Sequence, residues 1–112
     1  MKKIEAIIRV EKLDDVRSSL EGLGYPGMTI TRVEGHGRQK GLVEQFRGRE
    51  FKLELLPKIK IEIVVKDSDV DKIASAISQA AKTGEIGDGK IFVYPADNAF
   101  RIRTGEKGDI AL

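Results

Sequence analysis

Two glycine-rich segments of the chain carry residue types that could hold a phosphate group. The first reads GHGRQKG from Gly35 to Gly41, and the second reads TGEIGDGK from Thr83 to Lys90. Glycines let the backbone approach an anion closely and turn successive N–H groups toward it, while Arg38 and Lys90 add positive charge. Either segment alone is also compatible with an ordinary turn. The first is not a Walker A sequence, which ends in GKS or GKT before a helix.

A third candidate is a pair of arginines near the C-terminal end. We predict a short extended strand over residues 100–103, which would place Arg101 and Arg103 on one face, about 7 Å apart. Two guanidinium groups at that spacing can clamp a polyphosphate. The alternative is a solvated charged edge that discourages aggregation.

Together these groups predict nucleotide binding without catalysis. The two glycine segments and the four basic side chains exceed what folding alone requires. No residue set supplies a base for phosphoryl transfer, because Asp88 lies inside the glycine turn and His36 is the single histidine. We therefore expect a binding protein rather than an enzyme.

Composition narrows the class of protein further. The chain has 112 residues, with 20 Lys and Arg against 18 Asp and Glu, and its formal net charge is +2; we take residues 1–112 as one domain. The absence of cysteine excludes disulfides and thiolate metal sites. Near-balanced charge does not favour nucleic-acid binding. With no apolar run of about 20 residues and no secretory signal, we expect a cytoplasmic protein that does not insert into a membrane.

An internal repeat predicts the elements that position these groups. Residues 3–9 (KIEAIIR) align with residues 60–66 (KIEIVVK), and both alternate in the manner of a strand. A helical stripe of apolar residues follows each, and a further strand is expected at 28–33 and at 90–94. The order βαβ–βαβ predicts an α+β fold, the ferredoxin-like double βαβ sandwich, with an antiparallel four-stranded sheet and two helices on one face.

The second face of that sheet should carry Ile7, Val64 and Phe92 in a stripe among charged residues. We interpret the stripe as a contact with another subunit. The alternative is a set of scattered surface hydrophobics, which are normal.

Residues 37–57 are predicted as a long loop, because about 20 residues separate two strands where a hairpin needs two to five. Aromatic and basic residues alternate within it. Such a loop is typical of a docking surface for a partner. The alternative is a third hairpin that packs on the body of the domain.

Several motifs resemble those of the nitrogen regulatory PII signal-transduction proteins over essentially the whole chain. They include GRQKG at 37–41, LPKIKIE at 56–62, IGDGKIFV at 86–93 and RIRTGE at 101–106. The resemblance implies a non-enzymatic homotrimer with its sheets turned inward. It also implies that ATP or ADP binds in the clefts between subunits, and that residues 37–57 form the T-loop, whose shape follows the ligand.

The resemblance also implies roles for individual residues. Phosphates would be held by Gly35, Gly37, Arg38, Gly87, Asp88, Gly89 and Lys90, with Arg101 and Arg103 from the neighbouring chain. The adenosine side would be lined by Ile7, Thr29, Glu62 and Val64. In the family, Mg²⁺ bridges ATP and 2-oxoglutarate; Gln39 would bind the metal and Lys58 the distal carboxylate. Arg47 matches the position that plugs the mouth of an ammonium transporter.

The loop sequence departs from many relatives in a way that bears on regulation. Phe46 and Phe51 stand where many bacterial relatives have tyrosines. Because Phe51 has no phenolic oxygen, nucleotidylation there is chemically impossible. We expect regulation by ligand binding alone.

Two other functions fit the fold less well. A small acyl- or phosphate-hydrolysing enzyme would need a water-positioning side chain such as Asn in the cradle, but the only asparagine, Asn98, lies in the tail. An RNA-binding sheet needs aromatics on two central strands, and only Phe92 and Tyr94, both from one strand, qualify.

Overall fold

The structure is a computed structural model that describes residues 1–39 and 52–112. Its single sheet has the strand order β2-β3-β1-β4, and every neighbouring pair is antiparallel. The strands are β1 (Lys2–Ile8), β2 (Thr29–Gln39), β3 (Lys52–Val65) and β4 (Gly89–Pro95). This order is that of the predicted ferredoxin-like sandwich, and the predicted fold class is confirmed.

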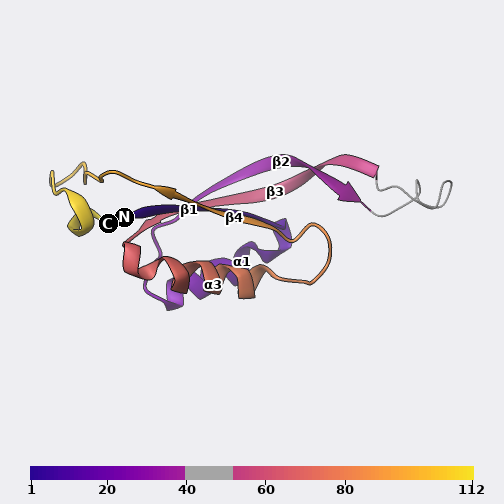
Figure 1. The fold of residues 1–112 in the computed structure, drawn as a ribbon, viewed down its shortest axis with the longest axis horizontal. Coiled ribbons are helices and arrows are strands. Elements are labelled where there is room, and N and C mark those ends of the chain that lie inside the picture. The colour runs from indigo at the N-terminus through magenta and orange to yellow at the C-terminus, as the bar shows by residue number, and fades with distance from the viewer. Residues whose placement is uncertain (40–51) are drawn as a thin grey trace.

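Both helices cover the same face of the sheet (Figure 1). They are α1 (Leu13–Gly22) and α3 (Val70–Ala81), and a 3₁₀ turn precedes each, at Val10–Lys12 and Asp67–Asp69. The periodicity of the sequence explains their orientation, because the apolar residues recur on one side of each helix. A third 3₁₀ turn, Gly108–Ala111, lies near the end of the chain.

The hydrophobic core lies between the helices and the sheet. It takes every second residue of β1 and of the second half of β3, as the predicted alternation requires. Helix residues fill the other side of this layer. The buried set is Ile4, Ala6, Ile8, Val16, Leu20, Ile59, Ile61, Ile63, Val65, Ile73, Ile77 and Ala81.

The predicted loop at 37–57 is too long, because both of its ends are strand. β2 continues to Gln39 and β3 begins at Lys52, with Gly37 opposite Glu54 in an unbroken antiparallel register. Glycine favours turns, but β2 is an outer strand with one neighbouring strand, and such a strand tolerates it. Pro57 is tolerated for a similar reason: β1 reaches only Ile59, so β3 has one neighbouring strand beyond that point. The remaining part of the predicted loop lies outside the described residues.

The predicted strand at 100–103 is also wrong. Phe100 forms an isolated bridge with Lys107, and the residues between them turn back on themselves. The backbone explains the turn: the N–H of Gly105 donates to the carbonyl of Arg101 at 2.7 Å, and the N–H of Arg101 donates to the carbonyl of Glu106 at 2.9 Å. A closed turn therefore replaces the extended segment.

No helix in the described part of the chain is both long and apolar enough to cross a membrane.

Candidate functional site

A cleft of about 1000 Å³ opens where β1, β3 and β4 meet the segment that follows α3. Strand β1 contributes Ile7, and Arg9 follows it directly. The turn between α3 and β4 contributes one wall. Among the described residues, the lining is Ile7, Arg9, Gly35, His36, Leu56, Lys58, Glu85, Ile86, Gly87, Asp88, Gly89, Lys90 and Phe92.

Asp88 organises the turn by accepting hydrogen bonds from several donors. Its carboxylate accepts from the backbone N–H of Thr83 at 2.9 Å and of Gly84 at 2.8 Å, and also from the hydroxyl of Thr83. The Nε of Arg9 donates to its Oδ1 at 3.1 Å. These bonds, led by that of the Thr83 hydroxyl, hold the pKa of Asp88 well below its ordinary value. The carboxylate is therefore a fixed part of the turn.

Two cations hold the carbonyl groups of the same turn. The Nη2 of Arg9 donates to the carbonyl of Ile86 at 2.8 Å, and the Nζ of Lys58 donates to the carbonyl of Gly87 at 2.6 Å. Burial lowers the pKa of Lys58, and the neighbouring charge of Arg9 lowers it further. The cleft thus concentrates positive charge on strand ends that the sheet fixes in place.

Gly89 brings the turn against β1 more closely than any other residue would allow. Its φ is +104°, and a Cβ there would lie 1.7 Å from the carbonyl oxygen of Ile7. The pairing of Ile8 with Gly89 requires this approach. Gly87, with φ of +102°, also adopts a backbone conformation that favours glycine.

The structure brings together only part of the predicted nucleotide site. Of the predicted residues, Ile7, Gly35, Lys58, Gly87, Asp88, Gly89 and Lys90 line the one cleft. Strand register explains this grouping, because Ile7 pairs with Lys90 on one side and with Lys60 on the other.

Thr29, Glu62 and Val64 do not line that cleft. They lie further along the sheet, where Thr29 pairs with Glu62. Glu62 is instead engaged in ion pairs on the sheet face that the helices leave open: its carboxylate lies 2.5 Å from the Nζ of Lys3 and 3.7 Å from that of Lys60. The hydrogen bond from Lys3 lowers the pKa of Glu62.

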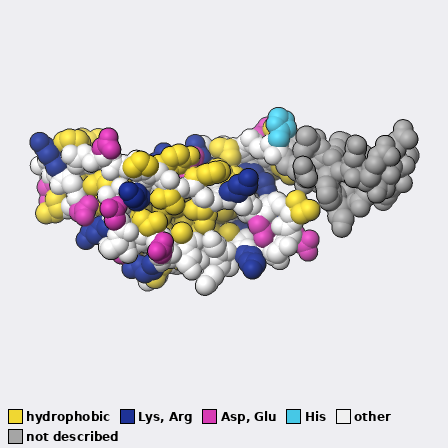
Figure 2. Space-filling model, in the orientation of Figure 1, with side chains coloured by type: hydrophobic (Ala, Val, Ile, Leu, Met, Phe, Trp, Pro, Cys, Tyr) yellow, Lys and Arg dark blue, Asp and Glu magenta, His cyan; other side chains and the backbone are white. Residues whose placement is uncertain are grey.

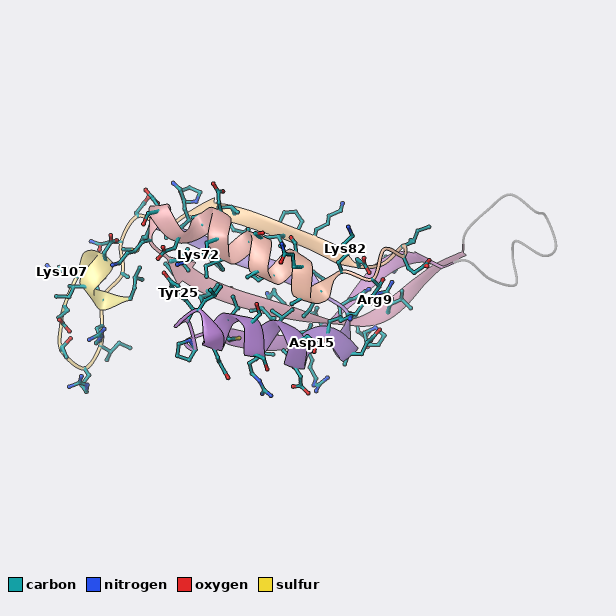
Figure 3. The ribbon with its side chains drawn as sticks, turned by 90° about the horizontal axis from the view of Figure 1, so that it is seen from below. Arg9, Asp15, Tyr25, Lys72, Lys82 and Lys107 are labelled. Carbon is teal, nitrogen blue, oxygen red and sulfur yellow. The ribbon has the colours of Figure 1, made fainter. Side chains whose placement is uncertain are left out.

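Arg101 and Arg103 lie far from the cleft of their own chain. Both follow the far end of β4, and Figure 3 shows Lys107 at the opposite end of the molecule from Arg9. Arg101 donates to Glu106 at 2.8 Å and to the carbonyls of Ile110 and Leu112. Within one chain, then, these arginines cannot complete a site with Lys90.

Three of the remaining predicted site residues lie on an outer strand of the sheet. Gly37, Arg38 and Gln39 lie at the end of β2. Arg47 lies outside the described residues.

Sequence reasoning missed Arg9 as a site residue, as well as Leu56 and Ile86. The strand alternation puts Arg9 on the same face of the sheet as Ile7, two positions earlier. This alternation could have identified Arg9 as a site residue, because Ile7 was predicted to line the site and both side chains line the cleft. Its partners, 77 and 79 positions away, were not deducible from spacing.

An exposed apolar patch accompanies the cleft along β4. Phe92 and Tyr94, which share the sheet face that the helices leave open, are each more than two fifths exposed. In Figure 2, hydrophobic side chains gather over the middle of the molecule, where β4 runs in Figure 1, with Lys and Arg side chains among them. Among the described residues, no group of three or more His, Asp or Glu side chains is arranged to hold a metal ion.

Comparison with known proteins gives one consistent result. The family model for nitrogen regulatory protein P-II matches residues 1–106. The nitrogen regulatory protein P-II of Pasteurella multocida (strain Pm70) is 57% identical over 112 residues, the whole of both chains. The nitrogen regulatory protein P-II 2 of Methanothermobacter thermautotrophicus is 55% identical over all of this chain and 97% of its own. That of Rhodospirillum rubrum is 54% identical over the whole of both chains.

Proposed function

The chain belongs to the nitrogen regulatory protein P-II family, and on that premise we propose that it senses ATP and ADP in clefts between the subunits of a homotrimer. Members of this family are regulatory signal-transduction proteins rather than enzymes, so a role in nitrogen signalling follows from membership itself. The nucleotide, the trimer and the target protein are the proposed parts.

The observation that carries the proposal is the composition of the cleft. Arg9, Lys58 and Lys90 line it together with the turn at Gly87–Gly89. Lys90 is exposed and its ammonium group forms no ion pair with any described residue. Positive charge and glycine backbone at one place are suited to a polyphosphate.

The position of the C-terminal arginines supports a cleft between two subunits. Arg103 is exposed and has no hydrogen bond or ion pair with any residue that the structure describes. Since it cannot reach Lys90 of its own chain, it would complete the cleft of a neighbour. The apolar stripe of Ile7, Val64 and Phe92 would then lie between subunits.

Magnesium and 2-oxoglutarate complete the proposed ligand set. Mg²⁺ prefers oxygen ligands and is commonly bound through few protein groups plus substrate phosphates. The Asp88 carboxylate is already saturated by internal donors, so Gln39 together with ligand phosphates would hold the metal. Lys58, at the edge of the cleft, would pair with a carboxylate of 2-oxoglutarate.

Subunit mixing tests the composite cleft. We expect Lys90→Ala and Arg103→Ala each to weaken ATP binding, measured by isothermal titration calorimetry. When the two variants are unfolded and refolded together, mixed trimers should contain some clefts with both residues intact, and tight binding should return. An affinity in the mixture no better than that of the two variants separately would contradict a site shared between subunits.

The proposed target is an ammonium transporter at the membrane, reached from the cytoplasm through Arg47. We expect Arg47→Glu to abolish co-sedimentation with vesicles that contain an ammonium transporter from the same organism, while ATP affinity is unchanged. Arg17→Glu is the control: it makes the same change of charge at an exposed position of α1 and should leave co-sedimentation unchanged. Equal co-sedimentation of the Arg47→Glu variant and the unmodified protein would count against this target.

A further inference from the structure

Four charged side chains form a cluster on the sheet face that the helices leave open (Figure 1). They are Lys3 and Glu5 of β1 and Lys60 and Glu62 of β3. Glu5 and Glu62 lie directly opposite each other in the antiparallel register, and like charges in that position repel each other. The two lysines lie beside them on the same face, so this repulsion is compensated inside one chain.

Every member of this charge cluster has a partner of opposite charge in the cluster. One carboxylate oxygen of Glu62 lies 2.5 Å from the Nζ of Lys3, and the other lies 3.7 Å from the Nζ of Lys60. The Nζ of Lys60 also lies 3.7 Å from a carboxylate oxygen of Glu5. The hydrogen bond to Glu62 raises the pKa of Lys3. Two ammonium groups and two carboxylates leave the cluster with no net charge.

Apolar and aromatic side chains surround the charge cluster on the same face. In the register of β1, Lys3 pairs with Val64 on one side and with Tyr94 on the other, and Glu5 pairs with Phe92. A hydrogen bond to Glu5 raises the pKa of Tyr94, so the phenolic hydroxyl adds a donor to the cluster. The four charged side chains are only 18% to 38% exposed in a single chain. A neutral, partly buried cluster among exposed aromatics is suited to a protein contact.

The neutrality of the cluster favours further copies of the same chain as the partner. Copies related by a rotation axis can bring the same face of each subunit together. A net charge on that face would then meet its own sign and repel. A partner of strong opposite charge, in contrast, would gain no attraction from a cluster whose charges cancel.

We propose that Lys3, Glu5, Lys60 and Glu62 pair within each chain, so that the open sheet face can be buried between copies of the chain without an unpaired charge. The inference rests on the proposed trimer and deepens it, because it names the groups on which the subunit contact depends. It also gives Glu62, which does not line the cleft, a role in assembly. Loss of one partner would leave a charge unpaired between subunits, which is strongly unfavourable.

Charge reversal at one member tests whether assembly needs the neutral cluster. We expect Lys3→Glu to raise the protein concentration at which half of the trimers dissociate by about a hundredfold or more, measured by sedimentation velocity across a dilution series. Arg17→Glu is the matched control, because it breaks an exposed ion pair with Asp14 on α1 and should leave dissociation unchanged. If Lys3→Glu and the unmodified protein dissociate at the same concentration, the inference is overturned.

Exchanging two charges distinguishes pairing within a chain from pairing between chains. When Lys3→Glu and Glu62→Lys are combined in one chain, the pair is kept with its signs reversed, and we expect most of the lost trimer stability to return. When the two single variants are refolded together, no chain contains a complete pair, and stability should not return. A double variant that dissociates as readily as Lys3→Glu, or a mixture as stable as the double variant, would overturn the inference.

Lys3→Met serves if Lys3→Glu does not fold, because it removes the positive charge without adding a carboxylate. We expect a smaller rise in the dissociation concentration, and an unchanged value would contradict the inference. If the unmodified protein is a trimer and every variant dissociates as it does, only this inference fails. If the unmodified protein sediments as a monomer at every concentration, the trimer of the proposed function fails as well.

Discussion

The Nε of Arg9 lies 3.1 Å from the Oδ1 of Asp88, which joins the residue after β1 to a turn 79 positions later. Thr83 and Gly84 donate to the same carboxylate, so that it accepts hydrogen bonds from three residues in all. It follows that the carboxylate of Asp88 is not available as a free base or metal ligand. The turn is instead an internal scaffold for its backbone.

The hydrogen bonds to Asp88 predict a specific dependence of stability on pH. Its pKa is lowered from 3.8 in the folded state, so its contribution to stability is present above that value and is lost as the pH falls and the folded carboxylate becomes protonated. We expect Asp88→Asn to be less stable than the unmodified protein at pH 7, and the difference to shrink between pH 4 and pH 2. Urea unfolding across this range measures it.

Asp97→Asn is the matched control, because Asp97 is exposed and has no hydrogen bond or ion pair with the described residues. Its stability difference from the unmodified protein should be near zero at every pH. A pH-independent difference for Asp88→Asn would show that its carboxylate charge is not what holds the turn.

Gly89→Ala should destabilise the protein strongly. The new Cβ would overlap the carbonyl oxygen of Ile7 at 1.7 Å, and φ of +104° is itself strained for alanine. We expect a loss of about 3 kcal/mol in the free energy of unfolding, with a weaker response to ATP. Gly27→Ala, where a Cβ meets nothing within 4 Å, should change stability by about 0.5 kcal/mol or less. Comparable losses in the two variants would refute the close approach to β1.

A second link, remote from the cleft, should affect stability alone. The hydroxyl of Tyr25 donates to Asp69, and the Nζ of Lys72 lies 3.6 Å from the same carboxylate and 5.9 Å from the Tyr25 ring centroid. We expect Tyr25→Phe to cost about 1 kcal/mol in urea unfolding and to leave ATP affinity unchanged. In an Asp69→Asn background the same substitution should cost less. An equal cost in both backgrounds would mean that the hydroxyl does not act through Asp69.

The proposed inward-facing sheet predicts the effect of a charge at Phe92. This side chain is 44% exposed in one chain, and a carboxylate buried at its place between subunits would be unpaired. In light-scattering chromatography we expect the unmodified protein to elute as a trimer and Phe92→Asp to elute as a 12.4 kDa monomer. Leu23→Asp, at a residue 38% exposed at the end of α1, should remain trimeric. A trimeric Phe92→Asp variant would place the contact on another surface.

The sequence predicted the elements well where periodicity was strong. One core buries the alternating residues Ile4, Ala6 and Ile8 of β1 and the residues Ile73 and Ile77 of α3. Because burial requires apolar residues at regular local spacing, these elements can be predicted from the sequence. The end of β2 was predicted too early, because Gly35 and Gly37 lie in an outer strand rather than in a turn. At the C-terminus, backbone hydrogen bonds between residues 101 and 106 outweighed the extended preference.

The candidate site was predictable in part. The residue types of Gly87, Gly89 and Lys90 are enough to predict the turn. The partners of the turn come from β1 and β3, and which of their side chains reach it depends on register, which a single sequence does not specify. The role of Asp88 as acceptor of internal bonds, rather than as a ligand group, likewise depends on donors that only the folded backbone assembles.

Strand β3 runs without interruption from Lys52 to Val65, and its register with β2 is regular from Lys52 to Glu62. The cleft residue Lys58 is the last residue of the part of this strand that pairs with β2 alone, and the next four residues pair with both β2 and β1. Because the strand and its register are continuous up to this point, a displacement of its outer part would reach the backbone of Lys58 without any movement between domains.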